Sequence, residues 1–360
     1  MTQLIIRLIE QQKEIPVWIT CGSTVPLTTY LLQRFGNYQL VAIADDLVAQ
    51  AQNNLLQDLR SHWQTFHLLT FPSGEASKNR HQKAALEDQL VNLGLGRDTV
   101  IMAIGGGVTG DLVGYVAATF QRGVPLVQVP TSLLAQVDSS IGGKVGINHP
   151  RGKNLIGAFY QPVAVLADVS TLRTLPENEY MNGLAEVIKY AITLSPELRQ
   201  LLHEHRGAIL KRDEEILQEV VRLSMAQKIK VVEADEKESG YRSILNFGHT
   251  VGHALEQLSH YKLKHGFAVA EGMRVALRLS HHLVGYPLQM VQFFDQMLDA
   301  YGFPVKHLHQ YAFDDIWQTI LFDKKVRQKQ PHFTLMKTPT EPALFVPVTK
   351  KELQNVLQNW

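Results

Sequence analysis

The chain has 360 residues, of which 45% are hydrophobic and 19% charged, so packed cores are expected and a disordered chain is excluded. Its 35 Lys and Arg residues balance 34 Asp and Glu residues, which argues against a general binder of nucleic acid or anionic membrane. The single cysteine, Cys21, rules out an intramolecular disulfide and a multi-cysteine zinc site. We see no signal peptide and no apolar run of about 18 residues, so we expect a cytoplasmic protein.

The first half of the sequence alternates apolar strand candidates with helical stretches. Such alternation favours a parallel-rich sheet covered by flanking helices. The run of apolar residues at 99–104 is typical of a strand that is buried on both faces. The expected strands are residues 17–21, 39–44, 65–70, 99–104, 125–129 and 163–168.

From about Asn178 onward, apolar residues recur at helical spacing. We therefore predict an α/β nucleotide-binding domain over residues 1–175, followed by a mainly α-helical domain over residues 176–360 that binds metal and substrate. The expected helices of the second domain are residues 178–193, 213–233, 243–260, 268–284 and 289–301.

A glycine-rich turn, residues 105–110, follows the buried strand and opens a helix. Glycines let the backbone approach a ligand, and a helix start offers free N–H groups to a phosphate. The spacing is not that of an ordinary Rossmann turn. Asp45 ends the second strand, where an acidic side chain commonly holds a ribose, although acids at strand ends are also ordinary surface residues. Residues 73–78 could be a capped helix start and nothing more.

Cations gather beside glycines in the middle of the chain. Lys144, Lys153 and Asn154 follow Asp138 within two glycine-containing loops. Lysines in such loops suit an anionic substrate, although isolated loop lysines are usually only solvated. The clustering favours a functional interpretation.

A metal site is indicated by three separate segments. His249 and His253 are four residues apart, so they share a helix face; His265 opens the next helical stretch, and Glu186 lies in an otherwise apolar helix. One Glu and two His are a typical catalytic zinc set. No Glu directly follows the first His, which excludes the metalloprotease pattern. Each histidine alone could be a backbone-bonded residue; the combination favours a metal.

Together these motifs resemble those of the 3-dehydroquinate synthase family, over residues 73–325. Beyond 325, the glycine-containing turn usual in that family is replaced by Val326-Arg-Gln-Lys-Gln-Pro331, which leaves the path of the last segment open. The matching motifs are GGGVTGD (105–111), TFQRGV (119–124), PTSLLA (130–135), DSSIGGK (138–144), GKNLIGA (152–158), GLAEVIK (183–189), NFGHTVGH (246–253) and DKK (323–325).

The resemblance implies a homodimeric lyase of the shikimate pathway that uses NAD and a divalent metal, zinc or cobalt. Its substrate would be 3-deoxy-D-arabino-heptulosonate 7-phosphate, and its products 3-dehydroquinate and phosphate. NAD would oxidise the C5 hydroxyl, which acidifies C6–H; phosphate leaves, the carbonyl is reduced again, the ring opens and an intramolecular aldol closes the carbocycle. NAD would be regenerated in each turnover.

Site residues follow from the resemblance position by position. Glu186, His249 and His265 resemble the metal ligands, and His253 a non-ligand histidine beside the phosphate. The phosphate-holding set would be Lys144, Asn154, Asn246 and Lys324, with Arg122 from a second subunit. Lys228 and Arg242 would clamp the carboxylate, and Asp138, Lys153 and Lys189 also match active-site positions. NAD-contacting positions would be Asp45, Ser73, Gly74, Glu75, Lys78, Gly106, Gly107, Val108, Asp111, Thr131, Ser132, Lys144, Lys153, Thr171, Leu172 and Thr174.

Three alternatives remain. Another sugar phosphate cyclase, such as a 2-deoxy-scyllo-inosose or valiolone-type synthase, would share NAD, metal and fold, but its substrate lacks the carboxylate. A metal-dependent polyol dehydrogenase of the glycerol dehydrogenase type would release NADH. A non-catalytic NAD-binding protein would have no need of the metal set.

Overall fold

The computed structural model of the chain describes residues 1–8, 13–238, 240–322, 326–327 and 330–358. Contacts divide the chain into two compact units. The first contains Met1–Tyr180 and Glu214–Lys237, and the second contains Met181–Asp213 and Glu238–Trp360. In the described part, no helix is long and apolar enough to cross a membrane.

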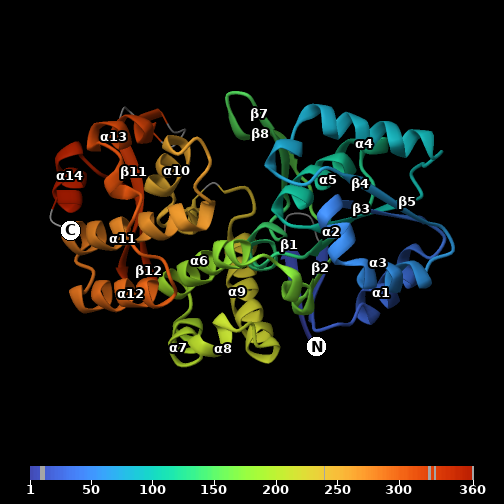
Figure 1. Cartoon of the computed structure of the whole chain (residues 1–360), viewed down its shortest axis with the longest axis horizontal. Helices are drawn as coiled ribbons and strands as arrows, with labels where there is room; N and C mark the ends of the chain where they lie inside the picture. Colours follow the sequence, from blue (N-terminus) through green and yellow to red (C-terminus); the bar gives the residue numbers. More distant parts are fainter. Residues whose placement is uncertain (9–12, 239, 323–325, 328–329, 359–360) are drawn as a thin grey trace. The chain divides into compact units, whose positions relative to one another are not determined.

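The first unit is built on a seven-stranded sheet (Figure 1). β1 pairs with β2 in antiparallel fashion, and the neighbouring strands from β2 to β4 all pair in parallel. Across the sheet the order is β1 (Thr2–Leu8), β2 (Lys13–Thr20), β9 (Ala164–Asp168), β6 (Leu126–Pro130), β5 (Thr99–Gly105), β3 (Gln39–Asp45) and β4 (Phe66–Phe71).

Helices cover both faces of this sheet. On β3, Leu40, Ala42 and Ala44 pack into one buried cluster with residues of α1 (Val25–Phe35) and α3 (Asn53–Ser61). Val41 and Ile43, which alternate with them, pack into a second cluster with residues of α4 (Arg80–Asn92) and α5 (Gly107–Thr119). Strand side chains point alternately to opposite faces, so continuous apolar runs give a sheet that is buried on both sides.

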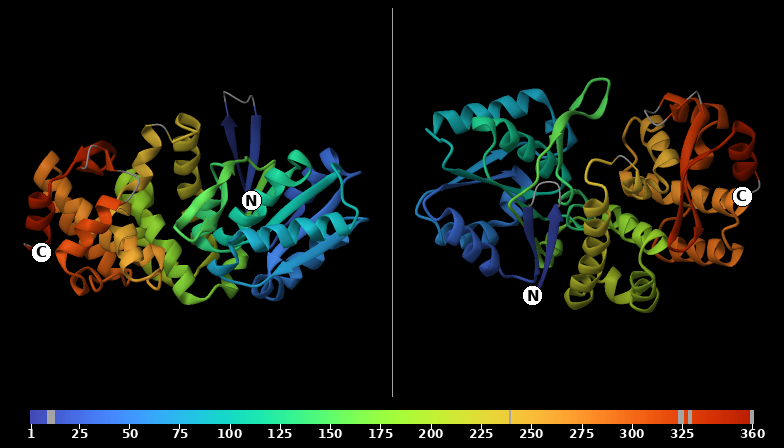
Figure 2. Two further views of the ribbon diagram at one scale, coloured as in Figure 1. Left: turned by 90° about the horizontal axis from the view of Figure 1, so that it is seen from above. Right: turned by 180° about the vertical axis from the view of Figure 1, so that it is seen from behind.

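The remaining elements of the first unit are a β-hairpin, short helical turns, helix α2 and the long helix α9. β7 and β8 form a separate antiparallel hairpin, drawn in green in Figure 2. Helix α9 contacts β1, β2 and two short turns of this unit, which is why it clusters here. These elements are α2 (Asp46–Ala51), η1 (Glu75–Ser77), η2 (Phe120–Arg122), η3 (Ala135–Ser139), β7 (Lys144–His149), β8 (Gly152–Phe159), η4 (Val169–Thr174) and α9 (Glu214–Ala234).

The second unit is mainly helical but also holds a three-stranded antiparallel sheet, β10–β11–β12. Its central pair of helices, α10 and α11, pack against each other, and β11 packs against α11. The elements are α6 (Glu177–Thr193), α7 (Pro196–Glu204), α8 (Arg206–Leu210), η5 (Tyr241–Asn246), α10 (His249–Leu258), α11 (His265–Val284), α12 (Leu288–Ala300), η6 (Leu308–Gln310), α13 (Phe313–Phe322), β10 (Val326–Arg327), β11 (Gln330–Thr338), β12 (Glu341–Pro347) and α14 (Lys350–Gln358).

The predicted fold class is confirmed, with local corrections. All six expected strands are present. The helix expected over residues 243–260 is wrong in one respect: the chain forms η5, then turns at Gly248, whose φ is +79°, before α10 begins. The glycine loops that carry Lys144 and Lys153 form the β7–β8 hairpin rather than open loops. Contact clustering places Lys228 on α9 with the first unit, while the division of function at residue 175 stays a prediction.

Candidate active site

Three side chains of the second unit meet as the sequence indicates for a metal site. Glu186, His249 and His265 each offer a ligand atom, and these atoms lie within 4.8 Å of one another. Both imidazoles face the same carboxylate oxygen: Nε2 of His249 is 3.5 Å from Glu186 Oε1, and Nε2 of His265 is 3.4 Å from it. The group combines one oxygen and two nitrogen donors, the ligand types that zinc accepts.

The opposite ring nitrogens of the two histidines face acceptors. Nδ1 of His249 lies 3.1 Å from the carbonyl oxygen of Phe247, and Nδ1 of His265 lies 2.9 Å from Glu256 Oε2. Burial lowers the pKa of His265, but hydrogen bonds and attraction from Glu186 and Glu256 outweigh it and raise that pKa to about 10. Two carboxylates at one imidazole mark an environment that attracts positive charge.

Glu186 is completely buried on α6, and Lys189, one turn later, is 1% exposed. The Lys189 ammonium contacts Glu186 Oε2, while Oε1 faces the histidines. His253 lies one turn after His249 on α10, with ring centroids 5.3 Å apart, and its ring is 6.0 Å from that of His265. The structure therefore brings Lys189 and His253 to the edge of the Glu186–His249–His265 group.

Close approaches at glycines bring the three helices together. A Cβ on Gly266 would lie 2.2 Å from the carbonyl oxygen of Asn182 on α6, and a Cβ on Gly272 would lie 2.0 Å from the carbonyl oxygen of Gly248. The Asn182 side chain also accepts a hydrogen bond from the Gly266 N–H at 2.6 Å. A side chain at either glycine would push α11 away, so these positions set where the first turn of α11, with His265, meets α6 and α10.

In the first unit, the glycine-rich turn follows β5 and begins α5, as expected. Gly106 is the N-cap of α5, and Gly105, the last residue of β5, has a φ of +159°. Cβ atoms on Gly106 and Gly107 would meet the hydroxyls of Ser132 and Ser139 at 3.3 and 3.2 Å. The turn therefore packs tightly against the segment after β6. Helix α5 begins at the carboxyl end of β5, and α/β sheets bind ligands at the carboxyl ends of their strands.

Asp45 and Asp111, both predicted to contact NAD, have structural partners. Asp45 Oδ1 caps α2 by accepting from the Val48 N–H at 3.0 Å. Lys78 Nζ lies 2.5 Å from Asp111 Oδ2 and 2.5 Å from Asn154 Oδ1. The structure thus joins Lys78 and Asp111, predicted for NAD, to Asn154, predicted for the phosphate.

Asn148 is a site residue that the sequence pattern does not indicate. Its Nδ2 donates to Glu75 Oε1 at 2.6 Å, and its Oδ1 accepts from the Asn154 N–H at 2.9 Å. Asn154 has φ +55°, a left-handed conformation that few non-glycine residues adopt. Asn148 therefore ties the β7–β8 hairpin to the loop that follows β4. Nothing in its sequence neighbourhood marks it, because the hairpin itself was not expected.

The remaining predicted cations and their partners are distributed over both units. Asp138, on the π-helical turn η3, contacts Lys228 Nζ of α9 at 2.5 Å. Arg242 is 1% exposed within η5, so it is not a surface arginine. Asn246 Nδ2 donates to Glu238 Oε1 at 3.2 Å, and no sequence motif marks Glu238 as its partner.

The other predicted site residues differ in solvent exposure, and one of them lies outside the described residues. Arg122 is exposed on η2, with φ +67° after Gln121 with φ +51°. Ser73 donates its backbone N–H to Asp46 at 2.9 Å, near Gly74 and Glu75. Lys324 lies outside the described residues. Buried or partly buried positions are Val108, Thr131, Ser132, Lys153, Thr171 and Leu172; Thr174 is exposed, and so is Lys144 at the start of β7.

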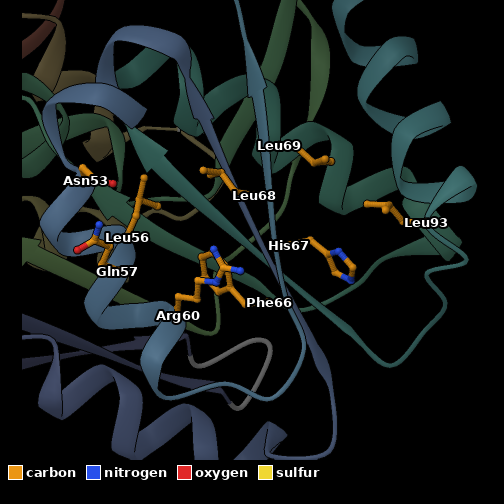
Figure 3. A pocket seen from close by; sticks show the side chains of 9 residues that line it. All are labelled: Asn53, Leu56, Gln57, Arg60, Phe66, His67, Leu68, Leu69 and Leu93. Atoms are coloured by element: carbon orange, nitrogen blue, oxygen red, sulfur yellow. The ribbon is translucent and has the colours of Figure 1, made fainter.

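A separate pocket of about 360 Å³ lies at the β4 edge of the sheet (Figure 3). It contains none of the predicted site residues. Its lining comes from α3, β4 and Leu93: Asn53, Leu56, Gln57, Arg60, Phe66, His67, Leu68, Leu69 and Leu93.

The chain is similar over nearly its whole length to solved sugar phosphate cyclases. It aligns with a 2-deoxy-scyllo-inosose synthase, solved with carbaglucose-6-phosphate, NAD⁺ and Co²⁺, at a TM-score of 0.89 and 25% identity, covering 99% of this chain and 100% of that chain. A 2-epi-5-epi-valiolone synthase from Streptomyces hygroscopicus, solved with NAD⁺ and Zn²⁺, gives a TM-score of 0.85 at 24% identity, with 96% of each chain covered. A glycerol dehydrogenase from Schizosaccharomyces pombe shares the fold at a TM-score of 0.67 and 16% identity, covering 95% of this chain and 88% of that chain.

Curated relatives are more similar in sequence. The 3-dehydroquinate synthase of Syntrophotalea carbinolica is 42% identical over 328 residues, which cover 91% of this chain and 90% of that protein. That of Desulforamulus reducens is 40% identical over 344 residues, 95% of this chain and 96% of that protein. The family models of the 3-dehydroquinate synthase N-terminal and C-terminal parts match residues 68–182 and 183–326.

The fold and the Glu–His–His group together define an enzyme of the sugar phosphate cyclase class. Within that class, the chain belongs to the 3-dehydroquinate synthase family.

Proposed function

We propose that the chain converts 3-deoxy-D-arabino-heptulosonate 7-phosphate into 3-dehydroquinate and phosphate. The observation that carries this proposal is the convergence of Glu186, His249 and His265 in a chain that is 40% identical, over 95% of its length, to a curated 3-dehydroquinate synthase. Three protein donors of these types form a catalytic zinc set that keeps a coordination position open for a substrate.

The donor set fits a zinc or cobalt ion, and the glycine-rich turn fits a dinucleotide. The solved cyclases carry NAD⁺ with Co²⁺ or Zn²⁺, and we expect the same kinds of cofactor here. When bound, NAD supplies reversible hydride transfer and the metal supplies Lewis acidity toward substrate hydroxyls. In the order of steps that the family implies, oxidation at C5 acidifies C6–H, phosphate leaves, C5 is reduced again, and the opened ring closes by an aldol addition.

The chain's own residues bind and orient the substrate. Lys144, Asn154 and Asn246 hold the phosphate together with Lys324, and His253 stands beside it. Lys228 and Arg242 hold the carboxylate, for which a guanidinium fork is well suited. The burial of Arg242 supports this role, because a buried arginine needs anionic or polar partners.

A homodimer completes the proposal, with Arg122 of each chain reaching the phosphate of the other. The exposed position of Arg122 and the two successive left-handed residues at its turn support this assignment, because backbone strain concentrates at functional sites. A cytoplasmic location also stays a prediction.

The second candidate is another sugar phosphate cyclase, favoured by the TM-score of 0.89 with the scyllo-inosose synthase. The two candidate functions differ in whether the substrate carries a carboxylate. The identity of 40–50% to curated 3-dehydroquinate synthases, against 25% to that cyclase, favours the first.

The test measures phosphate release and cyclic product from the heptulosonate phosphate, with NAD, with and without a chelator. We expect product without net NADH, loss of activity with the chelator, and loss of both metal and turnover in His265→Ala. Stoichiometric NADH would support the polyol dehydrogenase instead. Turnover of glucose 6-phosphate but not of the heptulosonate phosphate would support a scyllo-inosose synthase, because the solved relative of that kind is bound to carbaglucose-6-phosphate.

A further inference from the structure

Glu256 lies on the far side of a metal-site histidine. It is 5% exposed on α10, seven residues after His249, and its Oε2 is 2.9 Å from Nδ1 of His265. The same imidazole turns its Nε2 toward Glu186 Oε1 at 3.4 Å. One ring thus stands between two carboxylates, each of which faces a different nitrogen.

The two partners of this ring have different chemical demands. A carboxylate only accepts hydrogen bonds, so a proton shared with Glu256 must be carried by Nδ1 of His265. That tautomer leaves the lone pair of Nε2 free to coordinate a metal beside Glu186. His249 shows the same pattern with a neutral acceptor, because its Nδ1 faces the carbonyl oxygen of Phe247 at 3.1 Å. Both rings therefore present Nε2 to the same oxygen.

We infer that Glu256 is a positioning residue for the metal site: its carboxylate holds the Nδ1–H tautomer of His265 and aims Nε2 at the ion. The inference rests on the metal assignment of the proposed function. A carboxylate does more here than a carbonyl would, because its charge makes the ligating nitrogen more basic as well as orienting the ring. Burial strengthens this effect, since little water screens the pair.

A competing interpretation makes Glu256 a ligand itself. Atoms of His253, Glu256 and His265 also lie within 4.8 Å of one another. However, Nδ1 of His265 lies at hydrogen-bond distance from Glu256, and one nitrogen cannot both carry that proton and coordinate an ion. If Glu256 positions His265, the hydrogen bond between the two side chains is kept. A second ion coordinated by Nδ1 of His265 would break that hydrogen bond.

The experiment titrates metal-stripped protein with Co²⁺, by chelator competition and by the visible Co²⁺ absorption, for wild type, Glu256→Gln and Glu256→Ala. Loss of an outer-sphere carboxylate typically weakens metal binding roughly 10–100-fold. We expect a loss in that range for Glu256→Ala and a smaller one for Glu256→Gln, whose amide oxygen still accepts from Nδ1. Saturating Co²⁺ should restore most of the turnover of Glu256→Gln, and the stoichiometry should stay at one ion per chain.

Glu271→Gln is the matched control. Glu271 is 2% exposed in the same unit and faces Nδ1 of His307 at 2.8 Å, but it belongs to neither potential metal group of the described residues. Glu271→Gln should lower thermal stability and leave Co²⁺ affinity unchanged. This control distinguishes the positioning of a metal ligand from the general damage caused by altering a buried carboxylate.

Each contrary result has a definite meaning. Unchanged Co²⁺ affinity and absorption in both Glu256 variants would overturn the inference. Two ions per wild-type chain and one per Glu256→Ala chain would also overturn it and make Glu256 a ligand. Failure of wild type to bind Co²⁺ at all would instead overturn the metal assignment of the proposed function.

Discussion

Arg242 is buried within η5, in contrast to the solvated surface arginine that is the ordinary expectation for this residue type. If it holds the substrate carboxylate, Arg242→Ala removes a charge-assisted hydrogen bond, which costs roughly 1.5–3 kcal/mol. We therefore expect kcat/KM for the heptulosonate phosphate to fall at least about tenfold.

Comparison with an analogue that lacks the carboxylate sharpens this prediction. Wild type should lose activity on the analogue, and Arg242→Ala should lose little further, because the partner is already gone. Additive losses from the enzyme and substrate changes would show that Arg242 and the carboxylate never meet.

Lys189 supplies a positive charge next to a completely buried carboxylate. Breaking a buried ion pair by removing one partner costs about 3–5 kcal/mol, because the remaining charge stays desolvated. Lys189→Met should therefore lower the urea midpoint of the metal-free protein, and Zn²⁺ should recover part of the loss by providing another cation beside Glu186. Lys211→Met, at an exposed lysine of the same unit, is the control and should be nearly silent. Equal midpoints for the two variants would contradict the prediction.

At the scale of the elements, the site depends on how closely helices can approach. The pair α10 and α11 meets where Gly272 would place a Cβ 2.0 Å from the backbone oxygen of Gly248. A backbone atom cannot rotate away as a side chain can, so the added methyl group must separate the helices that carry His249 and His265.

We therefore expect Gly272→Ala to lower both Co²⁺ affinity and thermal stability, with an overpacking cost of typically about 1–3 kcal/mol. Gly207→Ala, on α8 of the same unit, is the control, because its Cβ would meet nothing within 4 Å. It should leave metal binding unchanged and stabilise its helix slightly. Full metal affinity in Gly272→Ala would show that the helix spacing does not set the ligand geometry.

Several elements could be predicted from local pattern, and others could not. The apolar periodicity indicated α6, α9 and α12 nearly to their ends, because helical spacing repeats within a few residues. The same helical spacing continues through Gly248, but there the chain turns between η5 and α10. The β7–β8 hairpin was not predicted, because its strands contain several glycines and lysines and these residue types are disfavoured in strands.

At the scale of the whole molecule, the proposed homodimer can be tested by complementation between chains. Arg122→Ala and His265→Ala should each be inactive. If Arg122 acts in the site of the other chain, a mixed dimer contains one site with both residues intact, so random reassociation restores about a quarter of the wild-type sites. Activity is measured after joint unfolding and refolding of equal amounts.

Two results would contradict the prediction that Arg122 acts in the site of the other chain. Continued inactivity of the mixture, with mixed dimers demonstrated by mass, would place Arg122 in the site of its own chain. An intrinsically monomeric active protein would remove the assignment altogether.

The sequence by itself determined the fold class, the family and the residue types of the metal set, because apolar periodicity and motif spacing are local properties of the chain. Tertiary structure alone decided that both histidines turn Nε2 to one oxygen of Glu186, that Glu256 stands behind His265, and that α9 clusters with the first unit. These features depend on contacts between segments far apart in the chain. They form only where glycine backbones let helices meet and where burial demands a partner for each charge, and no single stretch of sequence carries that information.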